Sequence, residues 1–455
     1  MIITDSAIIL RNNKLIEDFR ERFNKSKTPI EVKFRDMIPE LKSKDRYTHL
    51  IHSYPAKLLV HIPYFFLNNT KFSIKGSNVL DPFNGTGTVY LETLLSGRNA
   101  FGADANPLAR LISKVKATRY DTNELKIYLD KIIKAARKSE LMILPEVRNC
   151  DMWFSPKNRD ALGRLLFQIN KIKVNSIKEF MLVCFSNCIK KVSYADPRVS
   201  VPVKINAEKY SDKPNLKKLA LKRINEINTI DVIEKFNSIV VENIKKYKRL
   251  ESISFQNNST NEIFHDARKL NTDCDKKMEL KSKTIKLIIT SPPYAGAQKY
   301  IRSCSLSLGW LGLSDIAGLR ELDRKNIGRE NYNVHEINIL KTGIRRADIL
   351  IQKIKVKSIE RANIACQYLL EMKTSIDEMI RVLNTNGYLV IVIGNNMICD
   401  FEFNTQEYLT TYITSKGLIL DFKLIDSINS YGLMTKRNKT ADIISREYIL
   451  VFKKY

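Results

Sequence analysis

The sequence predicts an α/β fold organised on a doubly wound sheet of seven strands. Three short apolar segments carry this prediction: Val79-Leu80, residues 100–103 and residues 286–290. Each ends in residues that stop a strand and lead into a turn or a helix. The remaining strands are expected at residues 263–264, 388–394, 418–425 and 447–453. Helical segments alternate with these strands over most of the chain, which is typical of α/β proteins.

The first strand runs into a glycine-containing turn and then into a helix. Asp81–Phe83 leaves the strand, and Gly85 and Gly87 allow the backbone to turn sharply and to approach a ligand closely. Thr88 can cap a helix over residues 89–95. Because many strand–helix turns need glycine for structural reasons alone, this turn by itself leaves a ligand site and a plain structural turn equally open.

The next strand ends in an acid. Residues 100–103 deliver Asp104, which lies 23 positions after Asp81. A glycine turn followed by an acid at the tip of the next strand suits a nucleoside ligand, whose ribose hydroxyls donate to the carboxylate.

A second strand end supplies a rigid elbow. Residues 286–290 form an apolar strand that ends in Ser291-Pro292-Pro293-Tyr294. Two prolines cannot continue a central strand, so they fix the backbone at the carboxyl edge of the sheet, where doubly wound folds bind ligands. The elbow offers a hydroxyl, a carbonyl outside the ladder and an aromatic ring.

Together these stretches resemble known motifs. Asp81-Pro-Phe-Asn-Gly-Thr-Gly-Thr88 resembles the cofactor loop, and Thr290-Ser-Pro-Pro-Tyr294 the catalytic motif, of the S-adenosylmethionine-dependent DNA amino-methyltransferases of restriction-modification systems, which methylate cytosine N4 or adenine N6. The resemblance covers roughly residues 47–118 and 261–455, mostly through short motifs. It implies a Rossmann-like methyltransferase sheet, S-adenosyl-L-methionine as cofactor, and double-stranded DNA and a cognate restriction endonuclease as partners.

The resemblance also assigns roles to individual residues. The segment before the cofactor loop would lie over the methionine end of the cofactor, and Asp266 would accept a hydrogen bond from the adenine amino group. The cofactor residues are Tyr54, Pro55, Ala56, Lys57, Asp81, Phe83, Gly85, Thr86, Gly87, Thr88, Asp104, Ala105, Asp266 and Ala267. The catalytic residues are Ser291, Pro292, Pro293 and Tyr294.

The elbow suits methyl transfer to an amine. The side-chain oxygen of Ser291 and the carbonyl of Pro292 can bind the two amine hydrogens and orient the nitrogen for in-line displacement. Tyr294 would stack on a base swung out of the duplex, since the amine cannot be reached in line within the stack. Family members with Ser at the first motif position more often methylate cytosine N4, so cytosine is preferred over adenine N6 here.

Composition and charge favour a polyanionic partner. The formal net charge is +27 and the sequence pI is about 9.6. Such an excess of positive charge attracts phosphates without sequence preference. A compositional bias of the source genome is an alternative reason for the abundant lysine. The seven cysteines and five histidines are scattered, so no metal site is expected, and neither is a membrane span or a signal peptide. These features favour a cytoplasmic protein.

Two lysine-rich, largely helical insertions interrupt the expected sheet. Alternating valines at 199, 201 and 203 suggest a short edge strand in the first. Candidate nucleic-acid contacts in the two insertions are Tyr194, Arg198, Lys299 and Arg302, with a purely structural loop as an equal alternative for Tyr194 and Arg198. The expected organisation is a helical extension (1–46), a cofactor-binding half (47–119), a basic insertion for target recognition (120–257), the catalytic segment (258–296), a second insertion contacting DNA (297–375) and the C-terminal strands (376–455).

Two rival functions share these features. An RNA or tRNA base methyltransferase can carry both motifs, although no recognisable RNA-binding module is visible. A noncatalytic nucleic-acid-binding subunit with a methyltransferase fold is the other rival, and the intact motif residues argue against it.

Overall fold

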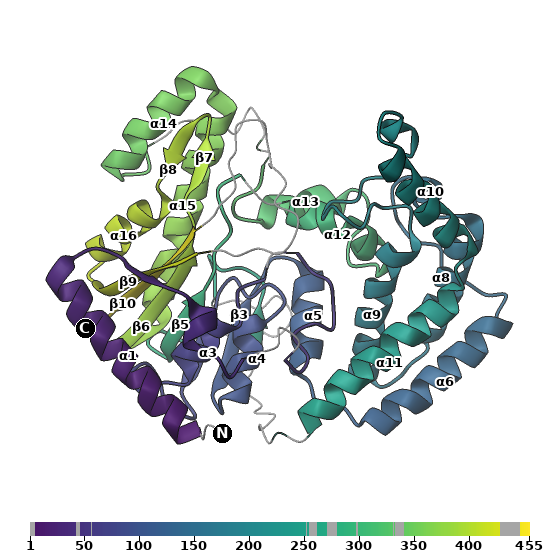
Figure 1. Ribbon diagram of the computed structural model, residues 1–455, viewed down its shortest axis with the longest axis horizontal. Coiled ribbons are helices and arrows are strands. Elements are labelled where there is room, and N and C mark those ends of the chain that lie inside the picture. The colour runs from purple at the N-terminus through teal and green to yellow at the C-terminus, as the bar shows by residue number, and fades with distance from the viewer. Residues whose placement is uncertain are drawn as a thin grey trace.

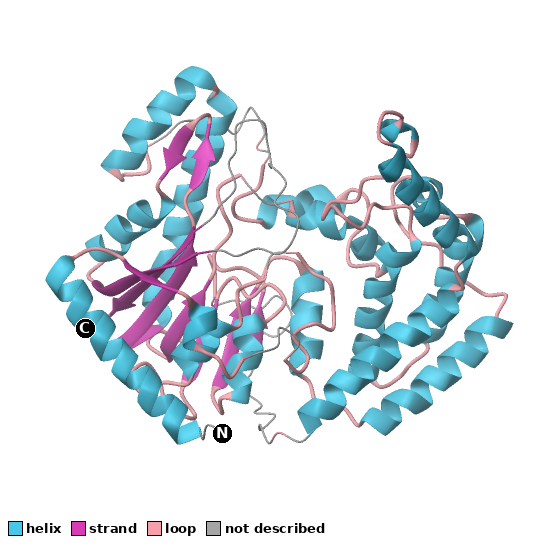
Figure 2. Ribbon diagram, viewed as in Figure 1, coloured by secondary structure: helices cyan, strands magenta, loops and turns pink. Residues whose placement is uncertain are grey.

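The computed structural model describes residues 5–41, 46–55, 57–251, 253, 262–270, 280–296, 299–330, 332, 341–427 and 446–455. Its centre is an eight-stranded sheet with the order β1-β9-β10-β6-β5-β2-β3-β4 (Figures 1 and 2). The α/β class is confirmed, but the expected number of seven strands is wrong. The additional strand is β1 (Ile30–Val32), which has three residues and pairs in parallel with β9 (Ile419–Ser427) at the sheet edge. Its short Ile-Glu-Val sequence is too weak a pattern to indicate a strand.

The central strands run in the same direction. The parallel pairs join β4 (Glu262–Phe264), β3 (Asn99–Ala103), β2 (Asn78–Asp81), β5 (Ile285–Thr290) and β6 (Leu383–Ile393). The strand order reverses between β2 and β5, since β3 and β4 follow on one side of β2 while β6 follows β5 on the other. Ligands bind at such a switch point, beyond the carboxyl ends of the strands. Both sequence motifs begin there. The last strand, β10 (Arg446–Lys453), runs antiparallel between β6 and β9.

Helices cover both faces of the sheet. On one face, Leu287 and Ile289 pack with α1 (Asp5–Ser26) and α3 (His61–Leu67). On the other, Ile288 packs with α15 (Ile359–Val382) and α16 (Thr405–Ser415). Successive residues of a strand point to opposite faces, so a strand buried on both faces is apolar throughout. The boundary expected at residue 375 falls inside α15.

The helix after the glycine turn is α4 (Thr88–Leu95), one residue longer at its start than expected. Its N-cap is Gly87 and no side chain caps it, so the capping role expected for Thr88 is wrong. The elements that complete the sheet region are α2 (Phe34–Met37), α14 (Arg345–Lys357), and the hairpin strands β7 (Asn396–Ile398) and β8 (Phe401–Phe403).

Residues 122–251 form a helical region beside the sheet, on the right of Figure 1. It shares an apolar core with α5 (Pro107–Ala117) and α12 (Tyr300–Trp310). The short strand expected at residues 199–203 is wrong, because only an isolated bridge joins Ala195 to Lys204. The elements here are α6 (Thr122–Lys138), α7 (Cys150–Trp153), α8 (Pro156–Asn170), α9 (Asn175–Ile189), η1 (Lys190–Val192), η2 (Glu208–Tyr210), α10 (Pro214–Thr229), α11 (Val232–Glu251) and, after α12, α13 (Gly318–Lys325). Within the described ranges, no helix is long and apolar enough to cross a membrane.

Candidate active site

A pocket lies at the switch point of the sheet, with about 650 Å³ of empty space including its open mouth. Both motifs contribute to its wall, as does the segment after β4. Expected residues that line it are Tyr54, Phe83, Gly85, Asp104, Ala105, Asp266, Ala267, Ser291 and Pro293. Lining residues that the sequence did not indicate are Pro82, Tyr300, Lys325, Asn326 and Ile327.

The two glycines of the loop have different surroundings. Both adopt left-handed backbone conformations, with φ of +49° at Gly85 and +72° at Gly87. A Cβ on Gly85 would have no atom within 4 Å, whereas a Cβ on Gly87 would lie 2.2 Å from Oγ of Ser113. Gly85 therefore leaves room on the pocket side, and Gly87 allows the loop to pack against α5. Thr86 and Thr88 are buried outside the pocket lining.

Asp104 joins the end of β3 to the glycine loop. Its Oδ2 accepts a hydrogen bond from the backbone N–H of Gly85 at 2.8 Å, and its Oδ1 accepts one from Asn106 at 2.8 Å. Burial raises the pKa of Asp104 to about 6. Each carboxylate oxygen has a second lone pair, so the group can accept ligand hydroxyls while it fixes the loop.

Asp81 lies behind the pocket wall, not in its lining. Its Oδ1 accepts hydrogen bonds from Oγ1 of Thr290 at 2.6 Å and from the N–H of Phe83 at 3.1 Å. The side chain is 4% exposed, and burial raises its pKa to about 7. Asp81 thus ties the cofactor loop after β2 to the residue that precedes Ser291.

Asp266, after β4, is held by an arginine. Arg268 binds it bidentately, with Nε 2.9 Å from Oδ1 and Nη2 2.8 Å from Oδ2. The backbone N–H of Arg268 also donates to Oδ1. The carboxylate is half-buried at the pocket, beside buried Ala267.

The elbow residues divide between the pocket and its support. Ser291 is half-buried and lines the pocket with Pro293, while Pro292 is buried outside the lining. The phenol of Tyr294 donates to Oε1 of Glu447 on β10 at 3.0 Å. Burial raises the pKa of Glu447, and the ring of Tyr294 packs against the apolar cluster on the α15 face of the sheet.

Of the described residues in the segment before the cofactor loop, Tyr54 enters the site. Tyr54 lines the pocket, and Nδ2 of Asn106 donates to its hydroxyl oxygen at 3.0 Å. Lys57 instead donates to the carbonyl of His52 at 2.7 Å, and burial lowers its pKa to about 8. Pro55 is half-buried outside the lining, and Ala56 lies outside the described residues.

The candidate nucleic-acid residues are mostly engaged within the protein. Tyr194 donates to Oδ1 of Asn228 at 2.5 Å, and Arg198 binds Asp196 at 2.6 Å and the hydroxyl of Tyr210 at 2.8 Å. In the second insertion, Lys299 pairs with Glu330 at 3.2 Å. Arg302 is exposed on α12.

Comparisons with known proteins agree with the two motifs. No protein-family model matches the chain. The type II methyltransferase M.MvaI of Kocuria varians is 24% identical over 436 residues, which cover 90% of this chain and 91% of the relative. The type II methyltransferase M.AvaI of Nostoc sp. is 24% identical over 445 residues, which cover 89% of this chain and 87% of the relative. The type II methyltransferase M.BsoBI of Geobacillus stearothermophilus is 25% identical over 287 residues, which cover 59% of this chain and 53% of the relative. The resemblance inferred from the motifs is confirmed, and the chain is a homologue of the type II DNA methyltransferases of restriction-modification systems over most of its length.

Proposed function

We propose that this chain transfers a methyl group from S-adenosyl-L-methionine to the exocyclic N4 amine of cytosine within a short DNA sequence. One observation carries the proposal: Ser291 of the elbow shares a single pocket with Gly85, Asp104 and Asp266. Ser291, which can accept a hydrogen bond from the amine, and the residues suited to a nucleoside therefore lie within reach of a cofactor and a target base bound together.

The pocket fits the cofactor that the relatives imply. Gly85 leaves its Cβ position empty, and Asp104 retains acceptor capacity for ribose hydroxyls. When bound, S-adenosyl-L-methionine supplies an activated methyl group, so the protein needs no covalent nucleophile.

The chain's own residues orient the amine. A base amine is a poor nucleophile, because its lone pair is delocalised into the ring. The hydroxyl oxygen of Ser291, which lines the pocket, accepts one of its hydrogens, and the carbonyl of the adjacent Pro292, which lies outside the lining, is the proposed acceptor of the other, so that the nitrogen is held close to tetrahedral. The elbow is rigid because of its two prolines and because the preceding Thr290 is bonded to Asp81. The released proton leaves to solvent.

Nucleoside analysis after methyl transfer tests the reaction. The chain is incubated with tritiated S-adenosyl-L-methionine and either plasmid DNA or total RNA, with Ser291→Ala as the matched inactive variant. N4-methylcytosine in DNA is expected. N6-methyladenine would overturn the base assignment, and methylated RNA with unmodified DNA would establish an RNA enzyme. Cofactor binding without any transfer would support a noncatalytic subunit.

We further propose that residues 194–230, the arm, contact the DNA backbone. The arm packs on its own small apolar cluster around Ile205 and Ile227 and carries eight Lys and Arg against four Asp and Glu. Among the described residues, the exposed side chains of Lys213, Lys218 and Lys222 have no ion-pair partner. Solvated lysines on a protruding arm suit phosphate contacts, which fix orientation without reading sequence.

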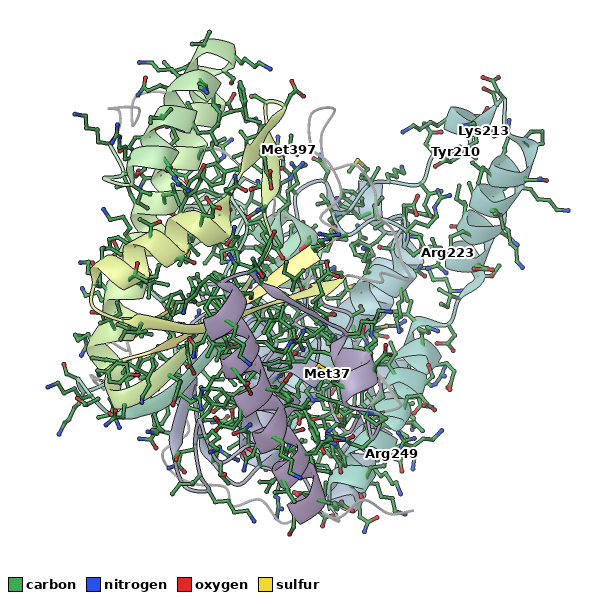
Figure 3. All side chains as sticks on the ribbon, turned by 60° about the vertical axis from the view of Figure 1, so that its left-hand side comes forward. Met37, Tyr210, Lys213, Arg223, Arg249 and Met397 are labelled. Atoms are coloured by element: carbon green, nitrogen blue, oxygen red, sulfur yellow. The ribbon has the colours of Figure 1, made fainter. Side chains whose placement is uncertain are left out.

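Salt dependence tests the arm. The triple variant Lys213→Gln, Lys218→Gln, Lys222→Gln should flatten the slope of log K against log salt by about 0.9 for each phosphate that the arm no longer neutralises. The matched control is Lys245→Gln, Lys248→Gln, Arg249→Gln on α11. Figure 3 shows Arg249 at the opposite end of the helical region from Lys213. An equal slope change in both variants would contradict the arm proposal.

A further inference from the structure

One side of the pocket comes from a segment outside every motif. Lys325, Asn326 and Ile327 line the pocket together with residues of the glycine loop and the elbow. They begin a stretch at residues 325–330, here called the strap, which starts at the last residue of α13. The strap therefore supplies part of the pocket wall.

Two arginines bind backbone carbonyls of the strap, Arg268 from the turn after β4 and Arg329 from within the strap itself. Nη2 of Arg268 donates to the carbonyl of Lys325 at 2.9 Å, and Nη1 of Arg329 lies 3.3 Å from the carbonyl of Asn326. Both hydrogen bonds involve residues of the pocket lining. The position of the two guanidinium groups therefore sets the position of this wall.

A buried carboxylate on α15 holds both arginines. Glu371 is 7% exposed, and its Oε1 lies 2.7 Å from Nη1 of Arg329 and 3.6 Å from Nη1 of Arg268. Arg268 in turn binds Asp266 in the pocket. Without Glu371, both Arg329 and Arg268 would lose a buried carboxylate partner, and breaking a buried ion pair in this way is strongly unfavourable.

The strap also contacts the elbow. Gly328 has a φ of +76°, and a Cβ there would lie 2.6 Å from the carbonyl oxygen of Tyr294. Lys299, just before α12, pairs with Glu330 at the other end of the strap. The strap thus fits closely between the nucleoside side of the pocket and the elbow.

We propose that Glu371 is a positioning residue for the cofactor: through Arg329 and Arg268 it fixes the strap as the wall that closes over the nucleoside part of S-adenosyl-L-methionine. This inference rests on the proposed function. Glu371 itself does not line the pocket. Glu371 affects how well the pocket wall is ordered, and therefore the affinity for the cofactor, more than it affects the chemical step.

Direct binding of S-adenosyl-L-methionine by calorimetry tests the role. Glu371→Ala should raise the Kd about tenfold or more, the size expected for a lost charged hydrogen bond. Glu371→Gln keeps an acceptor for Arg329, so it should recover part of the affinity. The double variant Glu371→Ala, Arg329→Ala should bind the cofactor with a Kd little higher than that of either single variant, because both changes remove the same attachment. In turnover assays the KM for cofactor should rise, while kcat at saturating cofactor stays close to that of the wild type.

The matched control is Asp377→Ala on the same helix. Asp377 accepts from the hydroxyl of Tyr412 and pairs with Lys416, away from the pocket. Its Kd for the cofactor should not change. Unchanged affinity in Glu371→Ala, or equal weakening in Asp377→Ala, would overturn the positioning role. If Glu371→Ala does not fold, unchanged affinity in Glu371→Gln overturns it instead. Failure of the wild type to bind the cofactor would overturn the proposed function and this inference together.

Discussion

The two sides of the pocket are built in different ways. On the motif side, short side chains at strand ends bind neighbouring backbone, as Asp104 binds the N–H of Gly85, or link adjacent strands, as Asp81 binds Thr290. On the strap side, long charged side chains reach carbonyls and carboxylates contributed by α13, α15 and the turn after β4. The motif side is thus fixed by the register of the sheet, whereas the strap side depends on ion pairs between segments far apart in the chain.

This difference predicts how each side fails. Changes at the loop glycines strain the backbone, so they should cost folding free energy as well as affinity, whereas a change at Asp81 should alter the pH dependence of stability. Changes at Glu371 break a buried ion pair without straining the backbone, so besides their cost in folding free energy they should loosen the pocket wall. Substitutions at five residues on the motif side test the first half of this contrast.

The largest effect is expected from Gly87→Ala. A left-handed alanine costs about 1–2 kcal/mol, and its Cβ would lie 2.2 Å from Oγ of Ser113 on α5. The Ser113 hydroxyl would have to turn away, losing its hydrogen bond from Asn84, and its backbone would have to give slightly, at a further cost of about 1–3 kcal/mol. Urea unfolding should therefore show a loss of about 2–5 kcal/mol in the free energy of unfolding.

Gly85→Ala is the matched variant. Its Cβ would meet no atom within 4 Å, so only the backbone strain remains. It should lose less stability than Gly87→Ala, yet still weaken cofactor binding, because the methyl group enters the pocket. Equal stability losses in both variants would show that packing against Ser113 does not distinguish the two glycines.

A pH-dependent effect is expected from Asp81→Asn. Burial raises the pKa of Asp81 to about 7, while an aspartate in an unfolded chain has a pKa of about 3.9. The stability that the protonated carboxyl contributes is complete below about pH 4 and is lost as the pH rises to about 7. The amide has no proton to lose in this range, and its oxygen can still accept from Thr290 and Phe83.

Urea titrations from pH 4 to pH 8 measure this difference. The free energy of unfolding of Asp81→Asn minus that of the wild type should increase by up to about 1.4 kcal/mol per pH unit between pH 4 and pH 7. Above about pH 7 the gain should level off. A difference that does not depend on pH would mean that Asp81 is ionised throughout.

The motif side could be predicted from the sequence, and the strap side could not. A strand that ends in Asp81, with glycines soon after it, constrains the local backbone so strongly that a few residues indicate the turn and the pocket. Asp104 follows because the next strand must end at the same edge. Nothing local marks Glu371, since a carboxylate within a long helix is usually solvated. Likewise, β1 could not be predicted, because three residues show too little periodicity.

A smaller effect is expected from Asp104→Ala. The substitution removes the acceptor proposed for the ribose and the hydrogen bonds to the N–H groups of Gly85 and Asn106. Cofactor binding should weaken by about 1.5–3 kcal/mol, the range for hydrogen bonds to a charged group. Calorimetry with S-adenosyl-L-methionine measures it, and unchanged affinity would remove Asp104 from the cofactor site. Asp104→Asn keeps one acceptor oxygen, so its affinity for the cofactor should lie between those of the wild type and of Asp104→Ala.

The smallest effect is expected from Tyr294→Phe. The change removes the hydrogen bond from the phenol to Glu447, whose net contribution to stability is about 1 kcal/mol. The aromatic ring, which packs against the apolar cluster on the α15 face and which the motif resemblance assigns to stacking on an extruded base, is kept, and such stacking is worth about 1–3 kcal/mol per base. DNA affinity and turnover should therefore remain largely intact in Tyr294→Phe and fall together in Tyr294→Ala. If Tyr294→Phe lost as much turnover as Tyr294→Ala, the bond to Glu447 would matter more than the ring. The elbow would then depend on a side-chain pair in the same way as the strap.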